Sequence, residues 1–126
     1  MKNSLFINFI IFILIFLGSN LKAETVFFDS KNIKIEENGN MIFATKGQAK
    51  IPSSNLTIEG DKFIYNKIDS ELLVIDDVKY FDDENNIYIE SDKIIYNEIN
   101  NTIFSKSDTY IKSEDDYEIN SNDVLY

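Results

Sequence analysis

The chain has 126 residues, a net charge of −10, and neither Cys nor His, and all twelve of its basic residues are lysine. This length fits one domain, and the composition excludes a Cys or His zinc site, a Ser-His-Asp triad and a thiol nucleophile. The acidic balance argues against a nucleic-acid partner, because phosphate backbones need a basic stripe. We therefore expect no enzyme, no metal site and no cofactor.

The first predicted element is a secretory signal peptide over residues 1–23. Lys2 precedes an apolar run from Leu5 to Leu17, and Ala23 supplies a small residue at a cleavage position. The run is shorter than the roughly 18–20 residues that a membrane-spanning helix needs. The alternative is an uncleaved N-terminal anchor. We expect export to a bacterial periplasm, with association with the outer membrane as a further option.

Residues 24–126 form the predicted domain, in which short segments alternate apolar and polar residues. Ala49 and Ile51, for example, flank Lys50. Alternation with β-branched and aromatic residues is typical of strands with one buried face. In chain order, strands are predicted at 28–35, 43–51, 58–65, 72–80, 89–96, 103–111 and 119–126, and polar turn formers lie between them.

One phrase recurs about every thirty residues. It reads IEGDKFIY at 58–65, IESDKIIY at 89–96 and INSNDVLY at 119–126, with a fainter copy, FDSKNIKI, at 28–35. Each unit of two antiparallel strands has an apolar face that it cannot bury alone. Stacked units bury it in a continuous interior. The sequence therefore predicts an all-β, twisted antiparallel structure of two-strand repeats.

The recurring phrase also predicts a bend within the strand. Ile58 and Phe63 are five residues apart, so strict alternation places them on opposite faces. A bulge or bend at the small residue Gly60 lets both face inward. The later copies repeat this spacing, with Ile89, Ser91 and Ile94, and with Ile119, Ser121 and Val124. The alternative is that the first residue of each pair merely starts its strand.

The last repeat unit is cut after one strand, which leaves an unpaired edge at Ile119, Val124 and Tyr126. Soluble proteins usually protect such an edge against pairing. Either the chain is a fragment of a longer protein, or the edge pairs with another β unit by strand addition.

Two stretches carry a resemblance to a known family, namely IEGDKFIYNKIDSELLVIDDVKYF at 58–81 and NGNMIFATKGQAKI at 38–51. With their spacing and repetition, they resemble the OstA-like β-jellyroll domains of lipopolysaccharide transport over residues 24–126. Within that family the chain is most similar to the N-terminal periplasmic domain of the assembly protein, and the alternative is the stand-alone bridging protein. The resemblance implies a jellyroll open along one side and stacked end to end with other jellyrolls. Its apolar interior would carry the acyl chains of lipid A.

Inward aromatic and aliphatic residues are the candidates for the lipid-binding groove: Phe63, Tyr65, Val78, Tyr80, Ile94, Tyr96 and Ile111. Aromatic side chains line a wide slot with few torsions to restrict. The simpler interpretation is that these residues form only the domain's own core. The matching alternative function is a structural β-solenoid or adhesin-like segment with a sealed core and no lipid ligand.

Overall fold

The structure, a computed structural model, describes residues 26–114 and 117–126, so the predicted signal peptide lies outside the described residues. The described part is all-β, as the alternation predicts. Its strands are β1 (Phe27–Glu36), β2 (Met41–Ile51), β3 (Leu56–Asn66), β4 (Glu71–Asp82), β5 (Ile87–Asn97), β6 (Thr102–Ser105), β7 (Thr109–Ser113), β8 (Glu118–Ser121) and β9 (Val124–Leu125). Two short 3₁₀ turns, η1 (Glu37–Gly39) and η2 (Pro52–Ser54), connect the first three strands.

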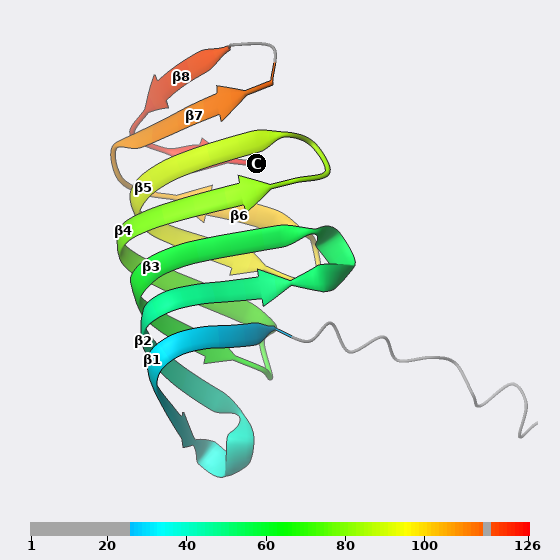
Figure 1. The fold of residues 1–126 in the computed structure, drawn as a ribbon, viewed down its shortest axis with the longest axis vertical. Coiled ribbons are helices and arrows are strands. Elements are labelled where there is room, and N and C mark those ends of the chain that lie inside the picture. Colours follow the sequence, from blue (N-terminus) through cyan, green and yellow to red (C-terminus); the bar gives the residue numbers. More distant parts are fainter. Residues whose placement is uncertain (1–25, 115–116) are drawn as a thin grey trace, which may run out of the picture.

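The strands form one open antiparallel sheet that divides at its C-terminal end. The order is β1-β2-β3-β4-β5-β6-β9, while β7 pairs with β5 and β8 pairs with β7. The division occurs along β5, because its residues 87–91 pair with β7 and its residues 94–97 pair with β6. In Figure 1 the strands follow one another along the long axis, from β1 and β2 at the bottom to β7 and β8 at the top.

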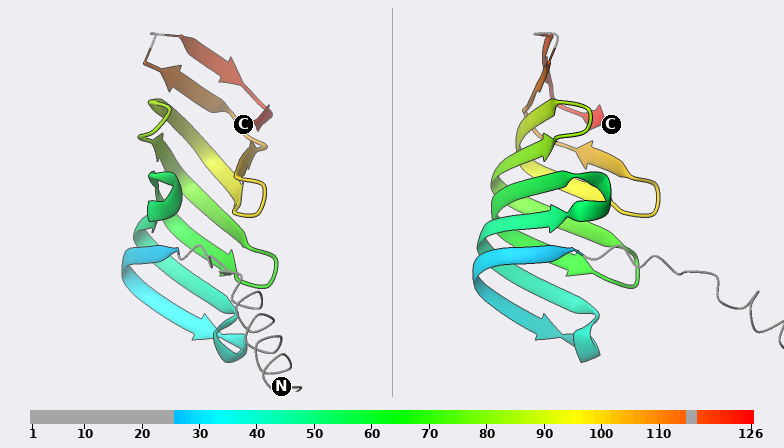
Figure 2. Two further views of the ribbon diagram at one scale, coloured as in Figure 1. Left: turned by 90° about the vertical axis from the view of Figure 1, so that its right-hand side faces the viewer. Right: turned by 45° about the vertical axis from the view of Figure 1, so that its right-hand side comes forward.

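The long strands bend midway, so the single sheet folds into two facing walls (Figure 2, right). We call them the β7 wall, which ends in β7 and β8, and the β6 wall, which ends in β6 and β9. The predicted bend in β3 is confirmed, since Ile58 and Phe63 are both buried while Asp61 and Lys62 between them are exposed. Ile89 and Ile94 of β5 are buried in the same way.

The extra residue that accompanies the bend lies in β4, at a place the sequence did not indicate. The pairing of β4 shifts against β5 between Ile75 and Val78, and against β3 between Ile75 and Lys79. Asp76 and Asp77 have φ values of 67° and 51°, so the backbone is left-handed at this bulge. Gly60 of β3 lies opposite, and a Cβ there would be only 2.5 Å from a methyl carbon of Val74. A small residue is therefore required where the walls meet.

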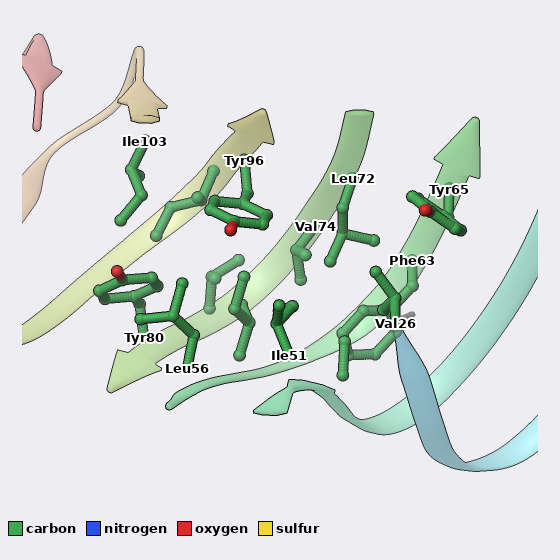
Figure 3. Close-up of a cluster of buried hydrophobic side chains, with 14 of the residues drawn as sticks. Val26, Ile51, Leu56, Phe63, Tyr65, Leu72, Val74, Tyr80, Tyr96 and Ile103 are labelled. Carbon is green, nitrogen blue, oxygen red and sulfur yellow. The ribbon is translucent and has the colours of Figure 1, made fainter. Parts of the chain in front are cut away.

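Side chains from both walls meet in the interior. Figure 3 shows Tyr80, Leu56 and Ile51 of the β7 wall opposite Ile103, Tyr96 and Leu72 of the β6 wall. The largest fully buried side chains are Tyr80, Tyr96 and Phe63. The core is thus the space between two halves of the same strands.

Three details differ from the sequence predictions. The predicted strand 103–111 is divided into β6 and β7 at residues 106–108, where the chain crosses between the walls. The predicted strand 119–126 is divided in the same way into β8 and β9. Ile33 and Ile35 follow the inward alternation but are 50% and 61% exposed, because β1 is the last strand on its side.

Candidate functional site

The inward side chains form rows that cross the sheet from strand to strand. In an antiparallel pair, directly opposite residues point to the same face. On the β7 wall the pairing aligns one row, which consists of Phe28, Ala49, Ile58, Tyr80, Ile89, Ile111 and Ile119. This row joins seven strands, so the apolar lining of the β7 wall runs from one end of the sheet to the other.

The β6 wall carries two such rows. The first consists of Ile33, Ala44, Phe63, Val74, Ile94, Ser105 and Val124. The second consists of Ile35, Ile42, Tyr65, Leu72, Tyr96 and Ile103, and Tyr126 extends it through a reciprocal pair of backbone hydrogen bonds with Ile103. The predicted groove residues of this wall, Phe63, Tyr65, Ile94 and Tyr96, all belong to these two rows.

The predicted groove residues are inside the protein, and neighbouring side chains cover most of them. Phe63, Tyr65, Val78, Tyr80, Ile94 and Tyr96 are each at most 5% exposed. Ile111 is partly buried and packs against the same cluster. Phe28 contributes to this cover, since its ring lies edge-on to Phe63 at 6.0 Å between centroids. In this structure, therefore, these side chains form a packed core, and Val78 also lines the edge of a cleft.

The inward rows become exposed at both ends of the sheet. At the C-terminal end, Ile119 is 53% exposed and Tyr126 is 41% exposed, whereas Val124 is partly covered. At the N-terminal end, Ile33 and Ile35 of β1 are exposed. The exposed C-terminal residues were predicted from the sequence, whereas the N-terminal end was not, although the faint repeat at 28–35 was a signal for it.

Both ends also carry strand edges without a ladder partner among residues 26–114 and 117–126. β1 pairs only with β2, β8 only with β7, and β9 only with β6. An unpaired strand edge offers backbone N–H and C=O groups to another strand. The ends therefore combine free backbone groups with exposed apolar side chains.

A buried polar group lies where the two walls approach each other on their open side. Asp82 of β4 occupies an inward position and is 5% exposed. Its carboxylate accepts hydrogen bonds from the backbone N–H of Glu84 at 3.1 Å and of Asn85 at 2.9 Å. The hydroxyl of Tyr126, from the β6 wall, donates to the same carboxylate at 3.4 Å. This contact links the walls at the C-terminal end.

The phenols near Asp82 are held in their neutral form. Burial, and then the charge of Asp82, raise the pKa of Tyr80 well above its usual range. Burial and Asp82 likewise raise the pKa of Tyr126. The hydroxyl of Tyr96 donates to the side-chain oxygen of Asn101 at 3.0 Å. The phenols of Tyr80 and Tyr126 are thus neutral beside the buried carboxylate of Asp82.

Hydroxyl groups hold the point where the sheet divides. Ser91 of β5 lies 2.8 Å from Ser105 of β6 and 3.2 Å from Thr109 of β7 between hydroxyl oxygens. Ser105 and Thr109 are 2.5 Å apart in the same way. These mutual bonds satisfy buried hydroxyls, and they fasten both branches of the sheet to β5.

A polar cleft of about 690 Å³ lies beside this point, and its lining includes Asp77, Lys79, Glu90, Asp92 and Asp108. Within the part of the chain that the structure describes, no three His, Cys, Asp or Glu side chains converge as metal ligands. No helix among the described residues is long and apolar enough to span a membrane.

No protein-family model matches the chain, and no curated protein sequence matches it.

Proposed function

We propose that the protein is a periplasmic domain for lipopolysaccharide transport, which holds lipid acyl chains in its apolar interior and stacks end to end with other β domains. One observation carries this proposal. The inward rows run without a break across the sheet and emerge exposed at both ends, beside unpaired strand edges. A second domain that continues the sheet would cover these side chains and extend the apolar interior.

The ligand class rests on the resemblance to the OstA-like jellyroll domains, together with the apolar lining. Burial of an acyl chain is worth on the order of 0.8 kcal/mol per methylene. A lining of Ile, Val, Phe and Tyr supplies such burial without directional bonds. The lining repeats from strand to strand, so an acyl chain that advances along it passes from one apolar environment to a similar one.

Loading requires the walls to separate on their open side, because the interior is filled by the protein's own side chains. The hydrogen bond between Tyr126 and Asp82 is one contact that must break at the C-terminal end. The covalent connection of the walls lies on the opposite side, at the bends of the strands. Separation at the open side therefore leaves the sheet pairing intact.

The covered interior favours a second candidate function, a structural β segment with a sealed core and no lipid ligand. Such a segment packs its inward residues against one another, and six predicted groove residues are almost fully covered. This candidate keeps the end-to-end stacking and removes only the lipid.

Site-specific photo-crosslinking in living cells separates these functions. A benzoylphenylalanine residue replaces Tyr96 in the interior or Ile119 at the exposed end, and Lys50 on the outer face is the control. We expect lipopolysaccharide adducts from Tyr96 and Ile119, detected by anti-lipopolysaccharide blotting, and none from Lys50.

The possible results differ clearly. Lipid adducts from Lys50 but not from Tyr96 would reverse the face assignment. Protein adducts from Ile119 without lipid at either inward position would leave the stacking in place and support the sealed structural segment. Absence of both kinds of adduct from Ile119 would contradict the stacking as well.

A further inference from the structure

The outer face of the β6 wall carries an apolar row of its own. Across six strands the pairing aligns large apolar residues that point away from the interior: Phe43, Ile64, Leu73, Ile95, Phe104 and Leu125. We call this set the outer row. Its first five members are partly exposed, and Leu125 is 75% exposed. The corresponding outward row on the β7 wall is mixed, since it combines the aromatic residues Phe27, Phe81 and Tyr88 with Lys50, Thr57 and Lys112.

Charges of opposite sign border the outer row. On the side of the bend lie Lys62 and Lys93, two residues before Ile64 and Ile95 on their strands, and Lys106 sits over the Phe104 ring at 5.5 Å. On the side of the loops, Glu71 lies two residues before Leu73. Glu36 of β1 lies on the same side, but its carboxylate already pairs with Lys34 of the same strand, so Glu71 is the main negative charge that this side offers.

We propose that this face binds a second copy of the same chain. A twofold axis along the outer row brings the row of one copy onto the row of the other. The same rotation exchanges the two sides, so the lysine side of one copy lies over the glutamate side of its partner. Lys93 of β5 then lies near the partner's Glu71, which is on the neighbouring strand β4. Lys62 already pairs with Asp76 at 2.6 Å, so Lys93 and Lys106 are the main positive charges offered.

A second copy fits this face better than a lipid surface does. An anionic bilayer surface that attracts Lys93 and Lys106 on one side would repel Glu71 on the other, whereas a second copy pairs both sides. Sheets that pack face to face are about 10 Å apart with nearly aligned strands, a geometry that a twofold axis along the row permits. Six strands span roughly 24 Å, so the contact is at the small end of stable interfaces.

This pairing is independent of the proposed lipid transport. It covers the outer face of one wall and leaves the exposed ends and the open side uncovered. Two domains held side by side in this way retain both edges for stacking.

Crosslinking tests the arrangement directly, because the chain has no cysteine of its own. Leu73→Cys places one thiol in the outer row at β4, where the twofold axis brings equivalent residues together. The matched control is Thr57→Cys, which is also partly exposed and faces outward on the β7 wall. Cells that express either full-length variant are treated with a short, membrane-permeant bismaleimide.

We expect a covalent dimer from Leu73→Cys and at most a tenth as much from Thr57→Cys. Lys93→Glu in the Leu73→Cys background lowers the yield at least threefold, and adding Glu71→Lys restores it, because the opposite charges are exchanged. A monomer from Leu73→Cys at a normal expression level overturns the proposal. Flotation of that monomer with anionic phosphatidylglycerol vesicles would assign the face to lipid instead. Failure of the double reversal to restore the dimer would refute the twofold orientation.

Discussion

Replacing Phe63 by alanine tests whether the interior is packed as the structure has it. The Phe63 side chain is 1% exposed and lies edge-on to Phe28. Removal of a buried phenylalanine costs about 3–5 kcal/mol, and the aromatic pair accounts for roughly 0.5–1.5 kcal/mol of such a loss. We expect about 4 kcal/mol, a large share of the 5–15 kcal/mol that stabilises a typical domain.

The assay is equilibrium urea unfolding of protein purified from cells that express the full chain, followed by circular dichroism. With a slope of about 1.5 kcal/mol per molar urea, the loss lowers the midpoint by about 2.7 M. Thr57→Ala, an outward residue of the same strand, is the control and should change stability by less than about 1 kcal/mol. Equal effects of the two substitutions would refute the packed interior and indicate that Phe63 lines a space which water or lipid normally fills.

Two further predictions concern the close approach of β2 to β1 and the buried phenols. Gly47→Ala should strongly destabilise the β1 edge, because the new Cβ would lie 2.1 Å from the backbone oxygen of Asp29. Amide hydrogen exchange should therefore become faster in β1 and β2, and unchanged exchange rates would contradict this close approach. The raised pKa of Tyr80 means that the folded state keeps its proton while the unfolded state, with a pKa near 10.0, loses it. The stabilisation that the neutral Tyr80 phenol contributes is therefore fully present below pH 10 and is lost as the pH rises further. Urea midpoints measured at pH 8 and pH 11 would show this loss. Tyr80→Phe should reduce this fall, and an identical pH dependence in the variant would contradict the assignment.

The sequence was sufficient for the long strands β1 to β5 and for the direction of their side chains, because alternation is a local property. Lys50 is exposed between buried Ala49 and Ile51, as the pattern requires. The spacing of Ile58 and Phe63 also predicted the bend correctly. In both cases the burial of an apolar face directly constrains the residue order.

The sequence did not reveal features that depend on contacts between distant strands. The bulge at Asp76 and Asp77 is required only because the neighbouring strands bend at the same place. Whether Ile33 is covered depends on what lies beyond β1, which alternation does not encode. Tyr80 and Tyr96 were predicted inward correctly, but a lined groove and a packed core give the same pattern. Asp82 was missed, although a carboxylate two residues after an inward Tyr80 was a usable signal.

The division of the sheet along β5 determines where the molecule is compliant. From β1 to β5 each strand belongs to both walls, so separating the walls there means straightening every bend at once. Beyond β5 the walls are separate strand pairs, β7 with β8 and β6 with β9, connected by residues 106–108 and by the turn before β9. The softest mode of deformation is therefore a splaying of the C-terminal mouth, with amplitude that decreases toward β1, and a guest molecule would meet the least mechanical resistance there.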